Sequence, residues 1–290
     1  MRLAFLGTPE AAVPSLRALV DNGHDVALVI TRPDRKRGRG GQLSPSAVKA
    51  CAQELGLTIG HRMSDLDDID VERGIVVAYG RLIPADVLAR IPMLNVHFSL
   101  LPRWRGAAPV ERAILTGDEE TGVSIMTLEA ELDTGPVHLQ RRVAVDATPL
   151  TALLDELATL GAAALVEVLG SPKLLAQPLA QKGEVTFATK LSKEDFHLTS
   201  SHSAAQLLRI VQLGQAFTMV GGRRLLVLSA TAYDGDVVPG SVALRDGRVV
   251  LGAFNGAIAL EHVRPESGRT MSAMAWWTGA RLDETAVRWA

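Results

Sequence analysis

The chain has 290 residues, of which 47% are hydrophobic and 21% charged, and its formal net charge at pH 7 is −2. This composition is typical of a globular protein with a sizeable core, and it excludes a chain drawn to nucleic acid by its overall charge. The single cysteine, Cys51, excludes a disulfide framework and a cysteine-ligated metal cluster. No run reaches the apolar length of a membrane span, and the N-terminal apolar run stops at Gly7. We therefore expect a cytoplasmic protein of two domains.

The first half of the chain alternates predicted strands and helices. Nearly continuous apolar runs predict strands at residues 2–7, 25–31, 74–79, 93–98, 122–129 and 137–145. Helices are expected at residues 10–22, 44–56, 84–90, 108–116 and 149–170. In the second of these, Ser44 is the expected N-cap and Pro45 the first helical residue. Buried strands separated by helices favour an α/β fold with a Rossmann-like, mainly parallel sheet covered on both faces.

The pattern changes after residue 170. Pro172, Pro178 and Gly183 interrupt the chain, so residues 171–195 are expected to be a linker. Beyond it we expect helices at 203–213 and 272–279, and short strands at 224–229, 240–245, 248–254 and 257–262. Short strands joined by Asp-Gly and Asn-Gly turns predict a smaller β-rich, barrel-like (OB-like) domain. The expected organisation is a catalytic domain at 1–170, the linker, and a C-terminal domain at 196–290.

Three polar residues near predicted strand ends indicate chemistry. Asn95 and His97 lie two apart in a predicted strand, so their side chains share one face near its carboxyl end, where open α/β sheets bind ligands. Asp133 lies in a loop that could fold over that end. Acyl transfer to an amine needs a donor to the oxyanion, a positioned base and a group that orients an imidazole. The same residues also fit a structural histidine and an ordinary Asp-containing turn.

The surrounding motifs resemble the signature of the 10-formyltetrahydrofolate-dependent formyltransferases. The Asn-x-His pair, the run from Ser99 to Gly106 and the Leu132-Asp133-Thr134-Gly135 loop match it in order and approximate spacing. The resemblance extends over almost the whole chain, through residues 5–10, 31–34, 78–84, 186–191 and 264–272. It is greatest to members that formylate the methionine of an initiator tRNA. It implies 10-formyltetrahydrofolate as the formyl donor, no metal, and initiator Met-tRNA as the partner, and we expect a monomer.

The resemblance also implies roles for individual residues. Asn95 would hold the formyl oxygen, His97 would be the acid, base or electrostatic partner of the intermediate, and Asp133 would orient His97 and accept protons. The folate site would be lined by Ser99, Leu100, Leu101 and Pro102, with the backbone of residues 80–83 facing the pterin ring.

The segment from Arg32 to Gly41 concentrates positive charge. It holds five cations against Asp34, a net charge of +4. Such a loop can follow a phosphate backbone, although a merely solvated loop is the alternative. The family resemblance implies that a loop of this kind reaches the tRNA acceptor stem. The expected tRNA-binding residues are Arg35, Lys36, Arg37 and Arg39.

The C-terminal part departs from the family pattern. The family's Trp is replaced by Phe196-His197, the turn after the next helix lacks its Pro, and residues 196–290 carry nine Arg against seven acidic residues. The sequence therefore specifies the formyl-transfer reaction more closely than it specifies the formyl acceptor. The alternatives are a formyltransferase acting on a nucleotide-linked amino sugar, a non-catalytic RNA-binding relative, and a hydrolase that releases formate. Gly7-Thr8-Pro9 does not form a dinucleotide fingerprint, so no nicotinamide cofactor is expected.

Overall fold

The structure, a computed structural model, describes residues 1–37, 41–281 and 288–289. The chain divides into two compact units, each assembled from several segments. The first unit takes Met1–Val110, Glu120–Ala144 and Leu153–Thr189, and the second takes Glu111–Glu119, Val145–Ala152 and Lys190–Ala290. The domain boundaries expected from the sequence, at 1–170, 171–195 and 196–290, stay a prediction.

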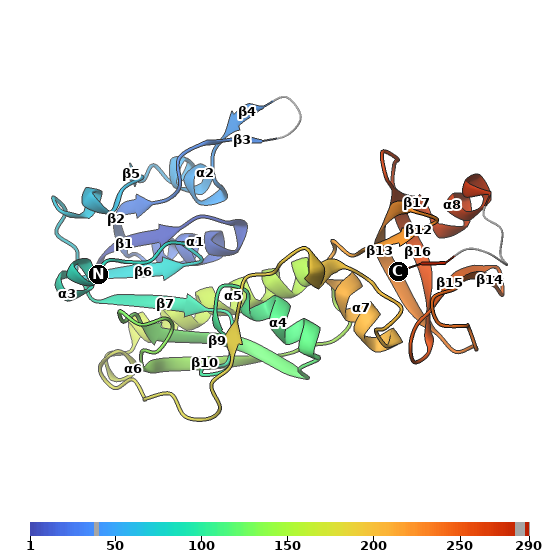
Figure 1. Cartoon of the computed structure of the whole chain (residues 1–290). Coiled ribbons are helices and arrows are strands. Elements are labelled where there is room, and N and C mark those ends of the chain that lie inside the picture. Colours follow the sequence, from blue (N-terminus) through green and yellow to red (C-terminus); the bar gives the residue numbers. More distant parts are fainter. Residues whose placement is uncertain (38–40, 282–287, 290) are drawn as a thin grey trace. The chain divides into compact units, whose positions relative to one another are not determined.

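A seven-stranded sheet organises the first unit (Figure 1). Its strands, in spatial order, are β10 (Val137–Ala144), β9 (Glu120–Thr127), β7 (Met93–His97), β6 (Arg73–Val77), β1 (Arg2–Gly7), β2 (Asp25–Ile30) and β5 (Ile59–Gly60). Strands β7 to β5 are parallel, whereas β9 pairs antiparallel with both β7 and β10. The parallel strands are buried almost throughout, which explains their continuous apolar sequences. The mainly parallel, Rossmann-like sheet is confirmed.

Helices cover both faces of this sheet. On one face, α5 (Leu150–Gly170) packs so closely that a Cβ built on Gly161 would lie 2.8 Å from Val96. The opposite face carries an apolar cluster that includes Val76, Tyr79 and Val87 of α3 (Ala85–Arg90). The remaining helical segments of this unit include η1 (Glu10–Ala12), α1 (Val13–Asp21), α2 (Ala47–Glu54), η2 (Met63–Leu66) and α6 (Pro172–Ala176). Because Val96 faces α5, its neighbours Asn95 and His97 face the other side of the sheet.

The basic segment forms a hairpin at its base. Strand β3 (Arg35–Arg37) pairs antiparallel with β4 (Gln42–Ser44), and Arg35 lies opposite Ser44. Helix α2 therefore begins after Ser46, whose hydroxyl accepts a hydrogen bond from the backbone N–H of Lys49 at 3.0 Å. The predicted N-cap at Ser44 was wrong because that residue completes the hairpin instead.

The segment expected to be a linker carries structure of its own. After α6, the strand β11 (Phe187–Ala188) pairs in parallel with β8 (Arg105–Gly106), a two-residue strand in the loop that follows β7. Residues 171–189 thus belong to the first unit, beside the segment that carries the family signature.

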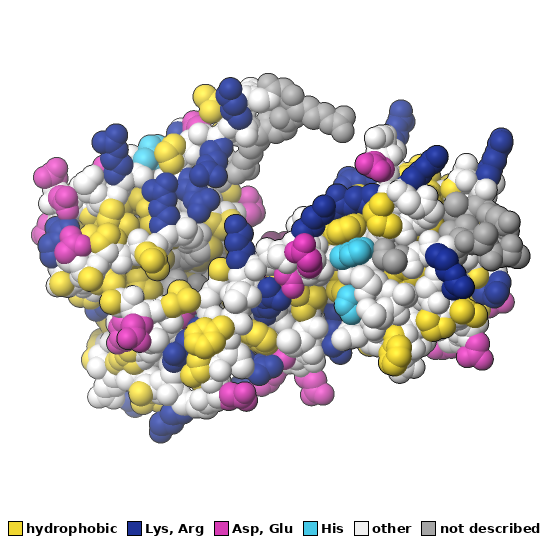
Figure 2. All heavy atoms as spheres, in the orientation of Figure 1, with side chains coloured by type: hydrophobic (Ala, Val, Ile, Leu, Met, Phe, Trp, Pro, Cys, Tyr) yellow, Lys and Arg dark blue, Asp and Glu magenta, His cyan; other side chains and the backbone are white. Residues whose placement is uncertain are grey.

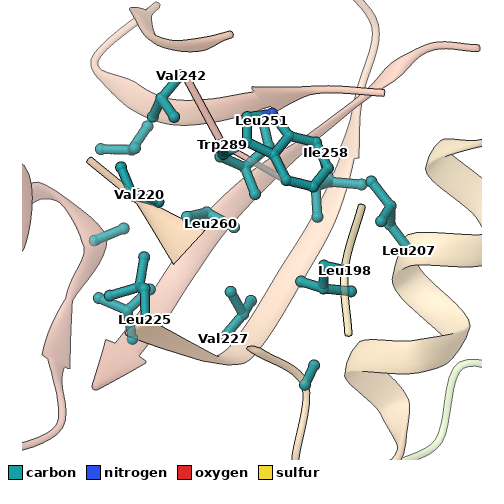
Figure 3. Packing of buried hydrophobic residues seen from close by; sticks show 14 of the residues in the cluster. Leu198, Leu207, Val220, Leu225, Val227, Val242, Leu251, Ile258, Leu260 and Trp289 are labelled. Atoms are coloured by element: carbon teal, nitrogen blue, oxygen red, sulfur yellow. The ribbon is translucent and has the colours of Figure 1, made fainter. Parts of the chain in front are cut away.

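An antiparallel sheet forms most of the second unit. Its order is β12 (Phe217–Val220), β13 (Arg223–Tyr233), β16 (Ala257–Pro265), β15 (Arg248–Gly252) and β14 (Val242–Arg245), with β17 (Met271–Ser272) paired to β16. The helical segments are α4 (Pro109–Thr116), shared with the first unit, η3 (Glu194–Phe196), α7 (Ala204–Gln212) and α8 (Ala273–Ala280). Leu198, Leu207, Leu251 and Trp289 meet in the core (Figure 3). The expected β-rich, barrel-like architecture is confirmed. No helix in the described residues combines the length and apolarity that crossing a membrane requires.

Candidate active site

A pocket of about 470 Å³ lies over β6 and β7 in the first unit. Val76, Asn95 and His97 contribute from the strands. The loop of residues 78–83 forms one wall and the loop of residues 128–133 another. The signature residues Asn95, His97 and Asp133 therefore line a single cavity, although Asp133 is distant from the other two in sequence.

The imidazole of His97 is held in a defined orientation. The side chain is buried, and Nε2 lies 2.9 Å from the backbone oxygen of Trp104. A carbonyl oxygen can only accept, so this contact places a proton on Nε2. The second nitrogen, Nδ1, faces Asp133 and is the one free to gain or lose a proton during a reaction.

Asp133 is the carboxylate opposite that nitrogen. Its Oδ2 lies 3.7 Å from Nδ1 of His97, and the two side chains are only 9% and 6% exposed. The same oxygen accepts a hydrogen bond of 2.8 Å from the backbone N–H of Gly106. At 3.7 Å the contact with His97 is electrostatic rather than a hydrogen bond.

Gln181 fixes the loop that carries Asp133 through hydrogen bonds. The amide nitrogen of Gln181 donates to the backbone oxygens of Asp133 and Gly135, each at 2.8 Å. Its amide oxygen accepts from Nε and Nη2 of Arg105, at 3.1 and 2.7 Å. One side chain therefore joins the Asp133 loop to the segment whose Gly106 N–H binds the Asp133 carboxylate. Nothing in the sequence around Gln181 signalled this role, because its partners are far away along the chain.

Asn95 presents its amide to the pocket. The residue is half-buried and lines the cavity beside His97. Among the described residues, no hydrogen bond engages its side chain, unlike that of His97. An uncommitted amide in a concave site is available to donate to a substrate oxygen.

The run from Ser99 to Pro102 is not among the residues that line this pocket. Ser99 is fully buried, and its hydroxyl donates to the backbone oxygen of Arg103 at 2.6 Å. Leu101 and Pro102 are also buried, and Leu100 is half-buried. The pocket wall is formed instead by Gly80, Arg81, Leu82 and Ile83. The folate-binding role of Ser99, Leu100, Leu101 and Pro102 stays a prediction.

The basic hairpin is exposed on the first unit. Arg35 and Lys36 lie on its surface, and Arg37 ends β3, while Arg39 lies outside the described residues. Figure 2 shows Lys and Arg side chains on the face from which this hairpin projects. Asp34, the only acid of the segment, is bound by Lys49 at 2.7 Å. Asp34 is therefore paired with Lys49, while Arg35 and Lys36 stay exposed.

Most of the chain matches a known protein family. The formyl transferase family matches residues 1–169, and the C-terminal domain of formyl transferases matches residues 190–281. The chain belongs to the formyl transferase family. The methionyl-tRNA formyltransferase of Jannaschia sp. (strain CCS1) is 42% identical to this formyl transferase over 299 residues, covering 97% of this chain and 98% of that one.

Solved structures of other proteins share the fold of this formyl transferase. The N-formyltransferase from Helicobacter canadensis, solved with folinic acid and dTDP-3-aminofucose, has a TM-score of 0.68 at 13% identity and covers 93% of this chain and 99% of that one. HypX from Aquifex aeolicus in complex with tetrahydrofolic acid has a TM-score of 0.63 at 20% identity. The match covers 96% of this chain but 47% of HypX, about half its length. At these identities the likeness shows the fold alone.

Proposed function

We propose that this formyl transferase moves a formyl group from 10-formyltetrahydrofolate to the α-amine of methionine on initiator Met-tRNA. The observation that carries the reaction is the convergence of Asn95, His97 and Asp133 on one pocket, with Nδ1 of His97 turned toward the carboxylate. The acceptor rests on the nearly full-length similarity to methionyl-tRNA formyltransferases, among them the one from Chromobacterium violaceum at 40% identity.

We propose a task for each of these residues in the reaction. The acceptor amine attacks the formyl carbon, a new C–N bond forms, and the carbonyl oxygen becomes an oxyanion. The Asn95 amide and a proton on Nδ1 of His97 would donate to that oxygen. The bond to the donor nitrogen then breaks, and the proton lost by the amine must reach that nitrogen. Asp133, beside His97, would take the proton from the amine and support its delivery.

The wall of the pocket suits the flat ring of a folate. The backbone of residues 80–83 borders the cavity next to Asn95 and His97. Backbone amides and carbonyls at a pocket wall can read the hydrogen-bonding edge of a heterocycle, while Val76 and Leu128 supply apolar contact. We propose this wall as the pterin site, which puts the formyl group within reach of Asn95.

An amino sugar linked to a nucleotide is the competing acceptor. The Helicobacter canadensis enzyme was solved with such a sugar, but it is 13% identical to this chain, whereas the methionyl-tRNA formyltransferases reach 42%. The basic hairpin also suits a polyanion better than a single nucleotide sugar.

A side-by-side formylation assay tests the proposal. Purified protein and 10-formyltetrahydrofolate are offered initiator Met-tRNA, a dTDP-linked amino sugar, or no amine, and the products are identified by mass spectrometry. We expect formyl-methionine on the tRNA and no formylated sugar. Formylation of the sugar alone, or release of formate without an amine, would reject the proposed acceptor.

A further inference from the structure

An arginine crosses the switch point of the parallel sheet. Strand β1 lies between β2 and β6, so the chain leaves the sheet in opposite directions on its two sides. Arg32 follows β2 and Gly80 follows β6, yet Nη2 of Arg32 donates to the backbone oxygen of Gly80 at 3.2 Å. The guanidinium therefore spans the carboxyl end of β1. Open α/β sheets bind ligands at this position.

The charge of Arg32 has no counter-ion in the described part of the chain. Its Nε is buried and has no hydrogen-bond partner. The nearest acid in sequence, Asp34, is bound by Lys49 instead. A buried donor without a partner is costly to the fold, so a persistent one indicates a site that a ligand completes. Arginine suits such a role because its planar fork binds phosphate and carboxylate oxygens in pairs.

Gly80 allows this approach and connects it to the pocket. Its φ of +73° lies in the left-handed region, and a Cβ there would come within 2.9 Å of Nη2 of Arg32. Gly80 and Arg81 also line the candidate active site. Arg32 is thus bonded to the pocket wall itself, rather than to a distant surface.

The two sides of the pocket differ in charge. The 128–133 loop brings Glu129, Glu131 and Asp133 to one wall, while Arg81 lies on the other wall with Arg32 bonded to its neighbour. An aminoacylated nucleotide has the matching polarity, since its amine is basic and its phosphate is anionic. The amine would enter beside Asp133, and the phosphate would lie on the side of Arg32.

We propose that Arg32 binds the 5′-phosphate of the terminal nucleotide that carries the methionyl group. The proposal rests on the proposed function and extends it to a phosphate subsite beside the pocket. A carboxylate of the folate glutamate tail offers similar chemistry. The phosphate is favoured because the exposed hairpin cations Arg35 and Lys36 follow Arg32 closely in the chain and extend its positive charge along β3.

The test uses two minimal acceptors with the full-length protein. In both, methionine is joined to the 3′ position of adenosine by a stable amide, and one of the two carries a 5′-phosphate. We expect wild-type kcat/KM to be on the order of tenfold higher with the phosphate, as for a charged hydrogen bond. Arg32→Gln, which removes the charge, should remove that preference, so that kcat/KM falls on the order of tenfold more with the phosphate than without it.

Two further variants control for the loss of an arginine. Arg32→Lys should restore part of the preference, because a point charge replaces the fork. Arg90→Ala removes an exposed arginine of α3 that pairs with Asp67 at 2.6 Å, and it should keep the full preference. On Met-tRNA itself, Arg32→Gln should raise KM. It should also reduce the slope of log kcat/KM against log salt concentration by about one.

Three results would overturn the phosphate subsite. The first is an equal loss on both acceptors, which would make Arg32 structural. The second is a change in the KM for the formyl donor in Arg32→Gln that is seen with 10-formyltetrahydrofolate but not with a donor that lacks the glutamate tail. The third is an unchanged salt dependence on Met-tRNA. Failure of the proposed function looks different, because wild-type protein would then formylate neither Met-tRNA nor the minimal acceptors.

Discussion

The two nitrogens of His97 are committed to different tasks. The backbone oxygen of Trp104 retains a proton on Nε2, so only Nδ1 can exchange one, and Nδ1 faces the carboxylate of Asp133. Trp104 is held for this role by the 181–188 segment, because its backbone N–H donates to the hydroxyl of Thr186 at 2.9 Å. The chemistry of one imidazole therefore depends on a residue seven positions away and on a segment much further along the chain.

Replacing either member of this pair should cost most of the activity. We expect His97→Ala and Asp133→Asn each to lower kcat by about two orders of magnitude, the scale of a positioned proton-transfer group. The double variant should be little slower than either single one, because the two residues act as a unit. Single-turnover formylation measures the effect, with thermal unfolding as the control for folding. Near-normal turnover by a folded His97→Ala protein would contradict the assignment.

Gln181 should behave as a positioning residue. Gln181→Leu removes both hydrogen bonds to the Asp133 loop, so we expect kcat to fall about tenfold with little change in KM, since misplacement by about 1 Å is costly to catalysis. In an Asp133→Asn background the same change should add little, because its effect passes through Asp133. Gln177→Leu, at an exposed glutamine of the same segment, is the matched control. Equal losses in both backgrounds would mean that Gln181 acts elsewhere.

At the scale of elements, β10 and α6 meet through a buried histidine. His138 is 8% exposed, its Nδ1 donates to the backbone oxygen of Leu174 at 2.9 Å, and its Nε2 accepts from the hydroxyl of Thr127 at 2.9 Å. Burial lowers the pKa of His138 below its ordinary value of 6.5, and the charge of Arg73 acts in the same direction, against the opposing effect of the Leu174 bond. The neutral ring therefore holds α6 against the sheet.

This contact predicts a loss of stability in acid. Because the folded pKa of His138 is lowered, the folded state binds fewer protons than the unfolded state, and stability declines as pH falls below about 6.5. We expect Tm to fall less between about pH 7.5 and 5.5 in His138→Gln than in the wild type. His24 and His202 also have lowered pKa values, but they are present in both proteins and cancel. Parallel pH slopes for the two proteins would contradict the prediction.

Hydrophobic periodicity predicted the strands whose own sequence pattern is enough to specify them. The buried strands β1, β6 and β7 were expected within two residues of their bounds, and the two-residue spacing of Asn95 and His97 correctly placed both side chains at one pocket. The short strands β8 and β11 were not expected, since each exists only by pairing with the other across the chain. Ser44 and Ser46 are equally good caps by composition, and only the hairpin pairing decides between them.

The whole molecule carries a net charge of −2, so nucleic acid binding depends on where the cations lie. The hairpin of the first unit concentrates them next to an acid that Lys49 has already neutralised. Residues 196–290, which make up most of the second unit, carry nine Arg against seven acidic residues. We therefore expect the hairpin to contribute more to tRNA affinity than the second unit does.

Two sets of substitutions test that expectation. Replacing Arg35, Lys36, Arg37 and Arg39 with Ala should weaken Met-tRNA binding and flatten its salt dependence, because fewer counter-ions are released. Replacing the exposed Arg245, Arg248, Arg264 and Arg269 of the second unit removes the same charge and should weaken binding less. Binding titrations at several salt concentrations measure both. A larger loss from the second set would move tRNA recognition to the second unit.

The second unit includes two short segments from outside its main range, Glu111–Glu119 and Val145–Ala152. Arg112 pairs with Asp195 at 2.8 Å, Gln212 donates to the backbone oxygens of Asp146 and Thr148, and Leu115 packs against the unit's core. A cut between Thr189 and Lys190 would therefore leave each fragment holding part of the same folded body. The protein is suited to fragment complementation: two chains expressed separately should find each other and rebuild one enzyme, because the completed second unit requires both.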